Sequence, residues 1–134
     1  IVAGGGVALI NSKGDLNKLK ASNSDESTGI QIVIKAIETP LRTIVEYSGG
    51  EGSVVVSKVL EGEKNYGYNA KEGKYVDMLK EGIIDPKKVT RVALENAASV
   101  AGMILTTECA LVDIKEENPA PMPPMGGGGM PGMM

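Results

Sequence analysis

Residues 85–105 read DPKKVTRVALENAASVAGMIL, and this stretch decides the fold class. Asp is a favoured N-cap and Pro a favoured first helical residue, so Asp85-Pro86 is typical of a helix start. Apolar side chains then recur on one helical face from Val89 to Ile104, with small residues between them that let neighbouring elements approach closely. The pattern predicts one long helix and favours a mainly α-helical fold.

Three helices are expected upstream of this stretch. An apolar run follows the triple glycine near the start of the chain, which favours a helix over about residues 6–20. Asn23-x-x-Glu26 resembles a capping box ahead of apolar positions at helical spacing. Thr39-Pro40 places a proline where a further helix would begin. The expected architecture is therefore a helical bundle.

Three short segments carry strand signals. Residues 53–60 contain three consecutive valines, and local propensity slightly favours a strand there although the same residues also fit one helical face. Residues 66–68 and 74–75 flank a turn-like stretch and predict a small β-hairpin. Residues 110–114 alternate in polarity and predict a short C-terminal edge strand.

Composition excludes several classes of function. The net charge is −3 with no basic stripe, so we expect no nucleic-acid partner. There is no His and a single cysteine, Cys109, which argues against a zinc site, a His-based triad or an internal disulfide. No apolar run reaches the length of a membrane span. Aromatic residues are four Tyr alone, so the core is expected to consist of Val, Ile, Leu and Ala.

The composition changes near Asn118. Residues 119–134 hold five Pro, five Met, five Gly and one Ala, with no charge. Such a segment buries too little surface to offset its ordering entropy. We therefore divide the chain into a folded part, residues 1–115, and a flexible Pro/Gly/Met-rich tail, residues 116–134.

Candidate ligand-binding residues each have a plainer structural explanation. Neither glycine cluster carries the Lys of a phosphate-binding P-loop or the spacing of a dinucleotide fingerprint. Gly4 to Gly6 would admit close approach of a ligand, but a glycine cluster is more often only a turn. Asp85 could accept hydrogen bonds from a ribose diol or simply cap the helix. Asn69 could contact a purine edge or simply belong to the hairpin turn.

Longer strings of residues resemble the group I chaperonins (the GroEL family) in order and spacing. The resemblance covers essentially the whole chain, including its Gly/Met-rich ending. The strings that carry it are Val2-Ala3-Gly4-Gly5-Gly6-Val7-Ala8-Leu9, Thr39-Pro40-Leu41-Arg42, Asn65-Tyr66-Gly67-Tyr68-Asn69-Ala70, Gly82-Ile83-Ile84-Asp85-Pro86-Lys87-Lys88-Val89-Thr90-Arg91, Ala97-Ala98-Ser99-Val100-Ala101-Gly102 and Thr106-Thr107-Glu108.

The resemblance implies that residues 1–115 are the C-terminal half of the equatorial, ATP-binding domain. It also implies that residues 53–60 are helical, and we expect a helix there. Lys71 departs from the family, which commonly has a small residue at this position. The site residues that it implies are the backbone of Gly5 with Gly4 near the ribose, Asp85 on the ribose hydroxyls, and Asn69, Ala70 and Ile83 around the adenine.

The resemblance further implies an ATP-hydrolysing, protein-folding machine. Its subunits form homo-oligomeric, seven-membered rings, usually double, that act with a co-chaperonin on non-native substrate proteins in the bacterial cytoplasm rather than an organelle matrix. The phosphate-binding loop and the hydrolytic and magnesium-binding aspartates of the family have no counterpart here, and potassium ligands are likewise expected elsewhere. We therefore expect no catalytic or metal-binding residue and no ATPase activity in this segment alone.

Two alternatives to the chaperonin interpretation remain from the sequence. One is a small stand-alone helical binding module without ATPase function. The other is a different nucleotide-binding enzyme with a glycine-rich turn. Both would require the ordered matches to have arisen by coincidence.

Overall fold

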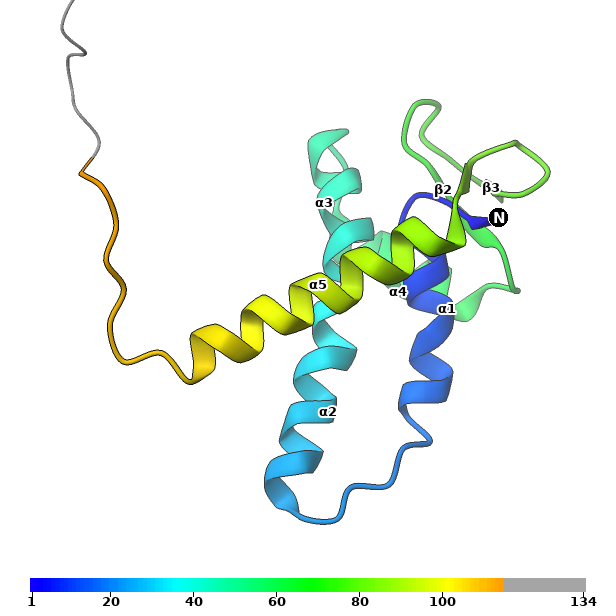
Figure 1. Cartoon of the computed structure of the whole chain (residues 1–134). Helices are drawn as coiled ribbons and strands as arrows, with labels where there is room; N and C mark the ends of the chain where they lie inside the picture. Colours follow the sequence, from blue (N-terminus) through cyan, green and yellow to red (C-terminus); the bar gives the residue numbers. More distant parts are fainter. Residues whose placement is uncertain (115–134) are drawn as a thin grey trace, which may run out of the picture.

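The computed structural model describes residues 1–114 of the chain, and it is mainly helical, as expected (Figure 1). Residues 1–114 form five helices and two small antiparallel sheets of two strands each. The elements in chain order are β1 (Val2–Ala3), α1 (Val7–Leu16), α2 (Ser24–Ala36), α3 (Thr39–Tyr47), α4 (Gly52–Glu61), β2 (Tyr66–Asn69), β3 (Lys74–Asp77), β4 (Ile84–Asp85) and α5 (Lys87–Leu105).

The hydrophobic core lies where α1, α3 and α4 meet the β2–β3 hairpin. Helices α1 and α2 lie side by side and run in opposite directions, and α3 continues beyond α2 (Figure 1). Val7, Leu41 and Val45 are completely buried between these elements. As expected from the composition, the core cluster is almost wholly aliphatic: Ala3, Val7, Ile10, Leu41, Val45, Val55, Val56, Val59 and Met78.

The Asn23 half of the expected capping box forms at the start of α2, and Glu26 bonds the residue before the N-cap in place of the N-cap itself. The Asn23 side chain accepts a hydrogen bond from the Glu26 backbone N–H at 2.8 Å, and the Glu26 carboxylate accepts from the Ser22 backbone N–H at 2.6 Å. The accepted hydrogen bond from the Ser22 backbone holds the pKa of the Glu26 carboxyl below its usual value. Together these two bonds fix where the helix begins.

The strand preference of residues 53–60 is wrong, because they form helix α4, as the family resemblance implied. Val55, Val56 and Val59 lie on one helical face and are all buried against the core. A strand would place alternate residues on opposite faces, so it could not bury these three together. Tertiary packing therefore overrides the β-propensity of the valines.

The predicted hairpin is present as β2 and β3, with Tyr66 opposite Asp77 and Asn69 opposite Lys74. The Tyr75 ring packs in stacked fashion on Tyr66, 5.7 Å between centroids, and edge-on against Tyr68, at 5.2 Å. Burial, with the two neighbouring phenols, raises the pKa of Tyr75. The tyrosines therefore hold the hairpin together and give it a packed face.

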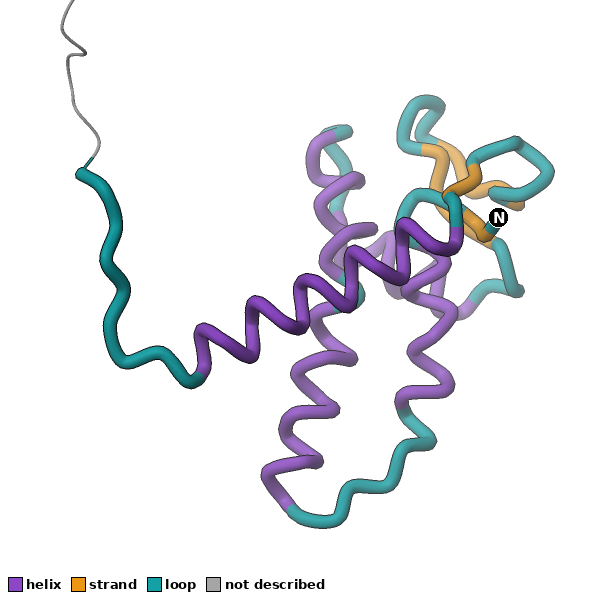
Figure 2. Tube along the Cα trace, viewed as in Figure 1, coloured by secondary structure: helices purple, strands orange, loops and turns teal. Residues whose placement is uncertain are grey.

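A second sheet joins the start of the chain to the start of α5 (Figure 2). In this sheet Val2 of β1 is paired with Asp85 of β4, and Ala3 with Ile84. The Gly4 backbone N–H continues the ladder by donating to the Ile83 carbonyl at 2.9 Å. Segments some eighty residues apart in the sequence are thereby fixed side by side.

Helix α5 has the expected length, but its N-cap is Pro86, so the prediction that Asp85 caps it is wrong. Asp85 belongs to β4 instead, because its backbone is engaged in the ladder with Val2. No residue of α5 is buried, and its last turns extend away from the other elements (Figure 1). Ile104 and Leu105 are 67% and 86% exposed.

The expected edge strand at residues 110–114 is not formed, although the backbone there is described. A strand is defined by hydrogen bonds to a neighbour, and none of residues 1–114 lies beside this segment as a strand partner. The proposed tail, residues 116–134, falls outside the described residues. Within residues 1–114 no helix combines the length and apolar character that crossing a membrane requires.

Candidate functional site

The three glycines at the start of α1 are required by the backbone and its neighbours. Gly5 and Gly6 have φ angles of +63° and +83°, in the left-handed region that disfavours other residues. A Cβ on Gly4 would lie 3.1 Å from the Ile83 carbonyl oxygen, and one on Gly6 would lie 2.8 Å from the Leu41 backbone nitrogen. The glycine turn therefore packs tightly on its neighbours, with Gly4 buried and Gly5 and Gly6 half-buried.

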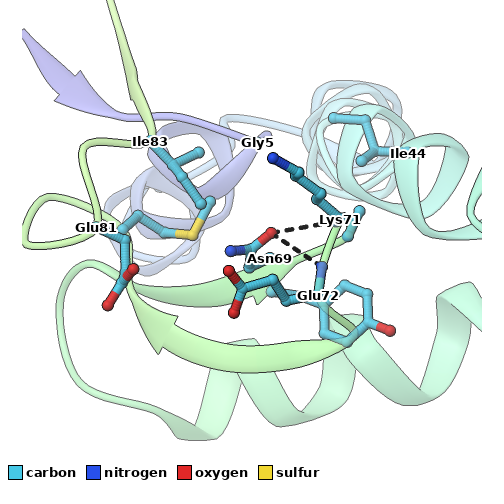
Figure 3. A pocket seen from close by; sticks show the side chains of 10 residues that line it. Gly5, Ile44, Asn69, Lys71, Glu72, Glu81 and Ile83 are labelled. Carbon is cyan, nitrogen blue, oxygen red and sulfur yellow. Dashed lines mark hydrogen bonds between the residues drawn. The ribbon is translucent and has the colours of Figure 1, made fainter.

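A first hollow, which we call the turn pocket, lies between the glycine turn and the tip of the hairpin (Figure 3). Its volume is about 440 Å³. It contains four of the six residues expected to bind nucleotide. Its lining residues are Gly5, Ile44, Tyr68, Asn69, Ala70, Lys71, Glu72, Met78, Glu81 and Ile83.

A second hollow, the helix groove, adjoins the turn pocket and runs between α1, α3 and α5, with a volume of about 650 Å³. Gly5 and Ile44 line both hollows, so the two meet at the glycine turn. Asp85 also lines the groove, just before the start of α5. The rest of the groove is mainly apolar: Gly6, Leu9, Ala36, Ile37, Thr39, Pro40, Thr43, Thr90, Ala93, Leu94 and Ala97.

The structure thus brings the expected site residues together around the glycine turn. Gly5 borders both hollows, Asn69, Ala70 and Ile83 lie on one side of it, and Asp85 lies on the other. Gly4 lines neither hollow, because its N–H is engaged with Ile83 in the backbone ladder. Its role in a site would be indirect, through the placement of its neighbour.

Asp85 presents a carboxylate without a protein partner among residues 1–114: it makes no side-chain hydrogen bond and no ion pair there. Its backbone is held by the β1–β4 ladder. A carboxylate accepts hydrogen bonds only, and it accepts them strongly from hydroxyl groups. The position is therefore suited to a ligand that offers hydroxyl donors.

Asn69 has its side-chain oxygen occupied by the hairpin turn. Its Oδ1 accepts hydrogen bonds from the backbone N–H groups of Lys71, at 3.1 Å, and Glu72, at 3.3 Å (Figure 3). This confirms the structural explanation of Asn69 as a turn residue. It also leaves the side-chain NH₂ without a protein acceptor among the described residues, so Asn69 can act toward a ligand only as a donor.

The charged residues of the turn pocket were not identified as a group from the sequence. Lys71 and Glu72 follow Asn69 directly in the hairpin turn, whereas Glu81 comes from the loop after β3. The hairpin prediction placed the first two beside Asn69, but nothing in the sequence places Glu81 there. Within residues 1–114 there is no cluster of three or more His, Cys, Asp or Glu side chains that could hold a metal ion.

Comparison with known proteins identifies the family of the chain and shows where its fold recurs. The chain matches the sequence profile of the TCP-1/cpn60 chaperonin family over residues 1–115. Its fold is similar to an open-state monomer of a group II chaperonin from Methanococcoides burtonii, with a TM-score of 0.70 and 24% sequence identity. The match covers 79% of this chain but only 28% of that one. The helical fold expected from the sequence is therefore the one found in a chaperonin, and this chain belongs to the TCP-1/cpn60 chaperonin family.

Proposed function

We propose that this chain is part of an ATP-dependent chaperonin of the group I type and supplies the nucleoside side of its nucleotide site. The observation that carries the proposal is the convergence of Gly5, Asn69, Ala70, Ile83 and Asp85 on two adjoining hollows at one glycine turn. These residues are far apart in the sequence, and each has the chemistry that a nucleoside needs.

The chemistry can be assigned group by group. Asp85 would accept hydrogen bonds from the ribose hydroxyls, because its carboxylate has no protein partner among residues 1–114. Ile83 and Ala70 offer apolar contact to the faces of a base. Asn69 would donate from its NH₂ to a ring nitrogen, since its oxygen already accepts two backbone hydrogen bonds.

Phosphoryl transfer depends on metal ions and charged groups that stabilise the transferring phosphoryl group. In this proposal the magnesium and potassium ligands and the hydrolytic residues belong to other parts of a chaperonin subunit. Bound ATP would supply the driving force of the whole machine by favouring one ring state over another. In this proposal residues 1–114 bind and orient the nucleoside and do not hydrolyse ATP.

The assembly is also a proposal. The exposed apolar side chains of α5, such as Val89 and Ile104, fit a helix that the rest of an equatorial domain covers. Residues 110–114 would complete a strand pair with a neighbouring subunit in a seven-membered, usually double, ring. A co-chaperonin, non-native substrate proteins and a bacterial cytoplasmic location belong to the same proposal.

The test uses a chaperonin subunit that carries these residues in place of its own matching segment, with nucleotide affinity measured by calorimetry. Replacing a charged hydrogen-bond acceptor costs about 1.5–3 kcal/mol, so Asp85→Asn should weaken ATP binding about tenfold or more. The matched control is Asp25→Asn, which removes an exposed carboxylate of α2 remote from both hollows.

Ligand variation makes this test specific to the ribose. With 2′,3′-dideoxy-ATP the hydroxyl donors are missing, so Asp85→Asn should change the affinity little. Equal losses for ATP and for the dideoxy nucleotide would mean that Asp85 acts on the structure and not on the sugar. Unchanged ATP affinity in Asp85→Asn would refute the assignment of the nucleoside site.

A further inference from the structure

One buried methionine closes the turn pocket toward the core. Met78 lines the pocket although it is only 1% exposed, and it belongs to the core cluster together with Val7. It follows β3 directly in the chain and is not among the residues that the family resemblance implied for the nucleotide site. Its contacts nevertheless connect it to each part of the turn pocket.

The end of the Met78 side chain supports the glycine turn. A Cβ placed on Gly5 would lie 2.8 Å from Met78 Cε, and among residues 1–114 this is the one atom, beyond its chain neighbours, that it would meet within 4 Å. The terminal methyl group of Met78 therefore lies directly against the Gly5 backbone. Since glycine has no side chain that could anchor it, this methyl group limits how far the Gly5 backbone can move toward the core.

The rest of Met78 is held by the two segments that carry the proposed base contacts. A Cβ placed on Gly67 of β2 would lie 2.6 Å from Met78 Cγ and 2.8 Å from its Sδ, so the side chain packs closely on that strand. Asn69 lies two residues further along β2. The Met78 carbonyl accepts a hydrogen bond from the Ile83 backbone N–H at 2.8 Å. One residue thus links the segments of Gly5, Asn69 and Ile83, which surround the turn pocket in Figure 3.

We propose that Met78 is a positioning residue, whose terminal methyl group fixes the Gly5 backbone at the separation from Asn69 and Ile83 that a nucleoside requires. This inference rests on the proposed nucleotide site. An unbranched thioether suits the role, because its rotatable bonds let it pack on β2 and still reach the glycine turn. Burial of one methyl group shifts an equilibrium about fourfold, so loss of this contact should lower the population of the binding-competent arrangement and weaken nucleoside affinity about threefold to fivefold.

The experiment measures ATP and adenosine affinity by calorimetry on the chimeric subunit described above, and its Tm without nucleotide. Met78→Leu conserves the volume and has a methyl group in place of Sδ, but it has no atom equivalent to Cε. We expect it to weaken both ligands about threefold to fivefold with little change in Tm. The matched control Ile10→Ala removes a buried side chain of the same core cluster that lines neither hollow. It should lower Tm and leave both affinities unchanged at temperatures where the variant is folded.

A double-mutant cycle tests the contact itself, and it decides the matter even if Met78→Leu lowers Tm. Gly5→Ala should lower Tm more in the unmutated background than in the Met78→Leu background, because the new Cβ meets Cε only in the former. Additive losses of Tm, unchanged affinities in Met78→Leu, a loss for ATP without one for adenosine, or an equal loss of affinity in Ile10→Ala would each overturn the inference while leaving the nucleotide site intact. Failure of the unmutated chimera to bind ATP would instead refute the proposed function, and the inference with it.

Discussion

Gly6 offers a sharp test of how the glycine turn is built, because the structure predicts opposite effects for two Gly→Ala substitutions around one helix. Gly6 is the N-cap of α1, at a φ of +83°, and packs on the backbone of α3 at Leu41. Gly14 lies inside α1, and a Cβ there would have no neighbour within 4 Å. Gly6→Ala should therefore destabilise the fold strongly, and Gly14→Ala should stabilise it.

The expected loss of unfolding free energy in Gly6→Ala is the sum of two costs. A residue with a Cβ in the left-handed region costs about 1–2 kcal/mol, and overpacking a tight contact costs about 1–3 kcal/mol. The contact cannot relax easily, since the new Cβ would lie 2.8 Å from the Leu41 nitrogen and 3.0 Å from its Cα, both backbone atoms. We therefore expect a loss of about 2–5 kcal/mol. Gly14→Ala should instead gain about 0.5–1 kcal/mol from helix propensity.

The assay is urea unfolding of the chain followed by circular dichroism at the helix minimum. Gly6→Ala is measured both alone and with Gly14→Ala, so that a transition remains observable if the single variant is too unstable. With a slope of about 1–3 kcal/mol per molar urea, the expected loss of about 2–5 kcal/mol lowers the urea midpoint by roughly 0.7–5 M. A midpoint for Gly6→Ala at or above that of the unmutated chain would refute the close packing of the turn on α3.

Three further substitutions test other parts of the structure. Leu41→Ala removes a completely buried side chain and should cost about 2–5 kcal/mol in the same unfolding assay, while an unchanged midpoint would contradict the burial. The hydrogen bond from the Ser22 backbone lowers the pKa of the Glu26 carboxyl. The ionised carboxylate therefore stabilises the fold fully above its unfolded pKa of 4.5, and this stabilisation is lost as pH falls through the folded pKa. Glu26→Gln should accordingly lower Tm at neutral pH but not in strong acid. Burial raises the pKa of Tyr75, so its contribution to stability is complete below the unfolded pKa of 10.0 and is lost as pH rises through the folded pKa. Tyr75→Phe should therefore lessen the loss of stability at alkaline pH. Identical alkaline Tm profiles of the two proteins would count against the burial of Tyr75.

Local signals in the sequence were sufficient for several elements of the fold. The capping residues Asn23 and Glu26 marked the start of α2, and the long periodic stretch after Pro86 marked α5. The turn flanked by tyrosines predicted the β2–β3 hairpin. These elements are specified by residues close together in the chain, which is why pattern and propensity identify them.

Two features were predicted wrongly from the sequence because they depend on contacts between segments that are remote in the chain. Residues 54–56 have strand propensity, but their burial against α1 and α3 requires a helical face. Asp85 has the residue type and position of an N-cap, but pairing with Val2 extends the strand by one residue and moves the cap to Pro86. Neither outcome follows from the local sequence, because each depends on a segment that is remote in the chain.

The same pairing decides whether a nucleoside site exists at all. The glycine turn and Asp85 are joined by a ladder of two residue pairs, extended by the hydrogen bond from Gly4 to Ile83. So short a ladder is marginal by itself, and the packing of Ala3 into the core must hold it in place. Val7 and Met78 extend that packing to α1 and to the end of the hairpin. The aliphatic core thus fixes both the carboxylate of Asp85 and the tip of the hairpin relative to one glycine turn, and the geometry of the candidate site is a consequence of core packing.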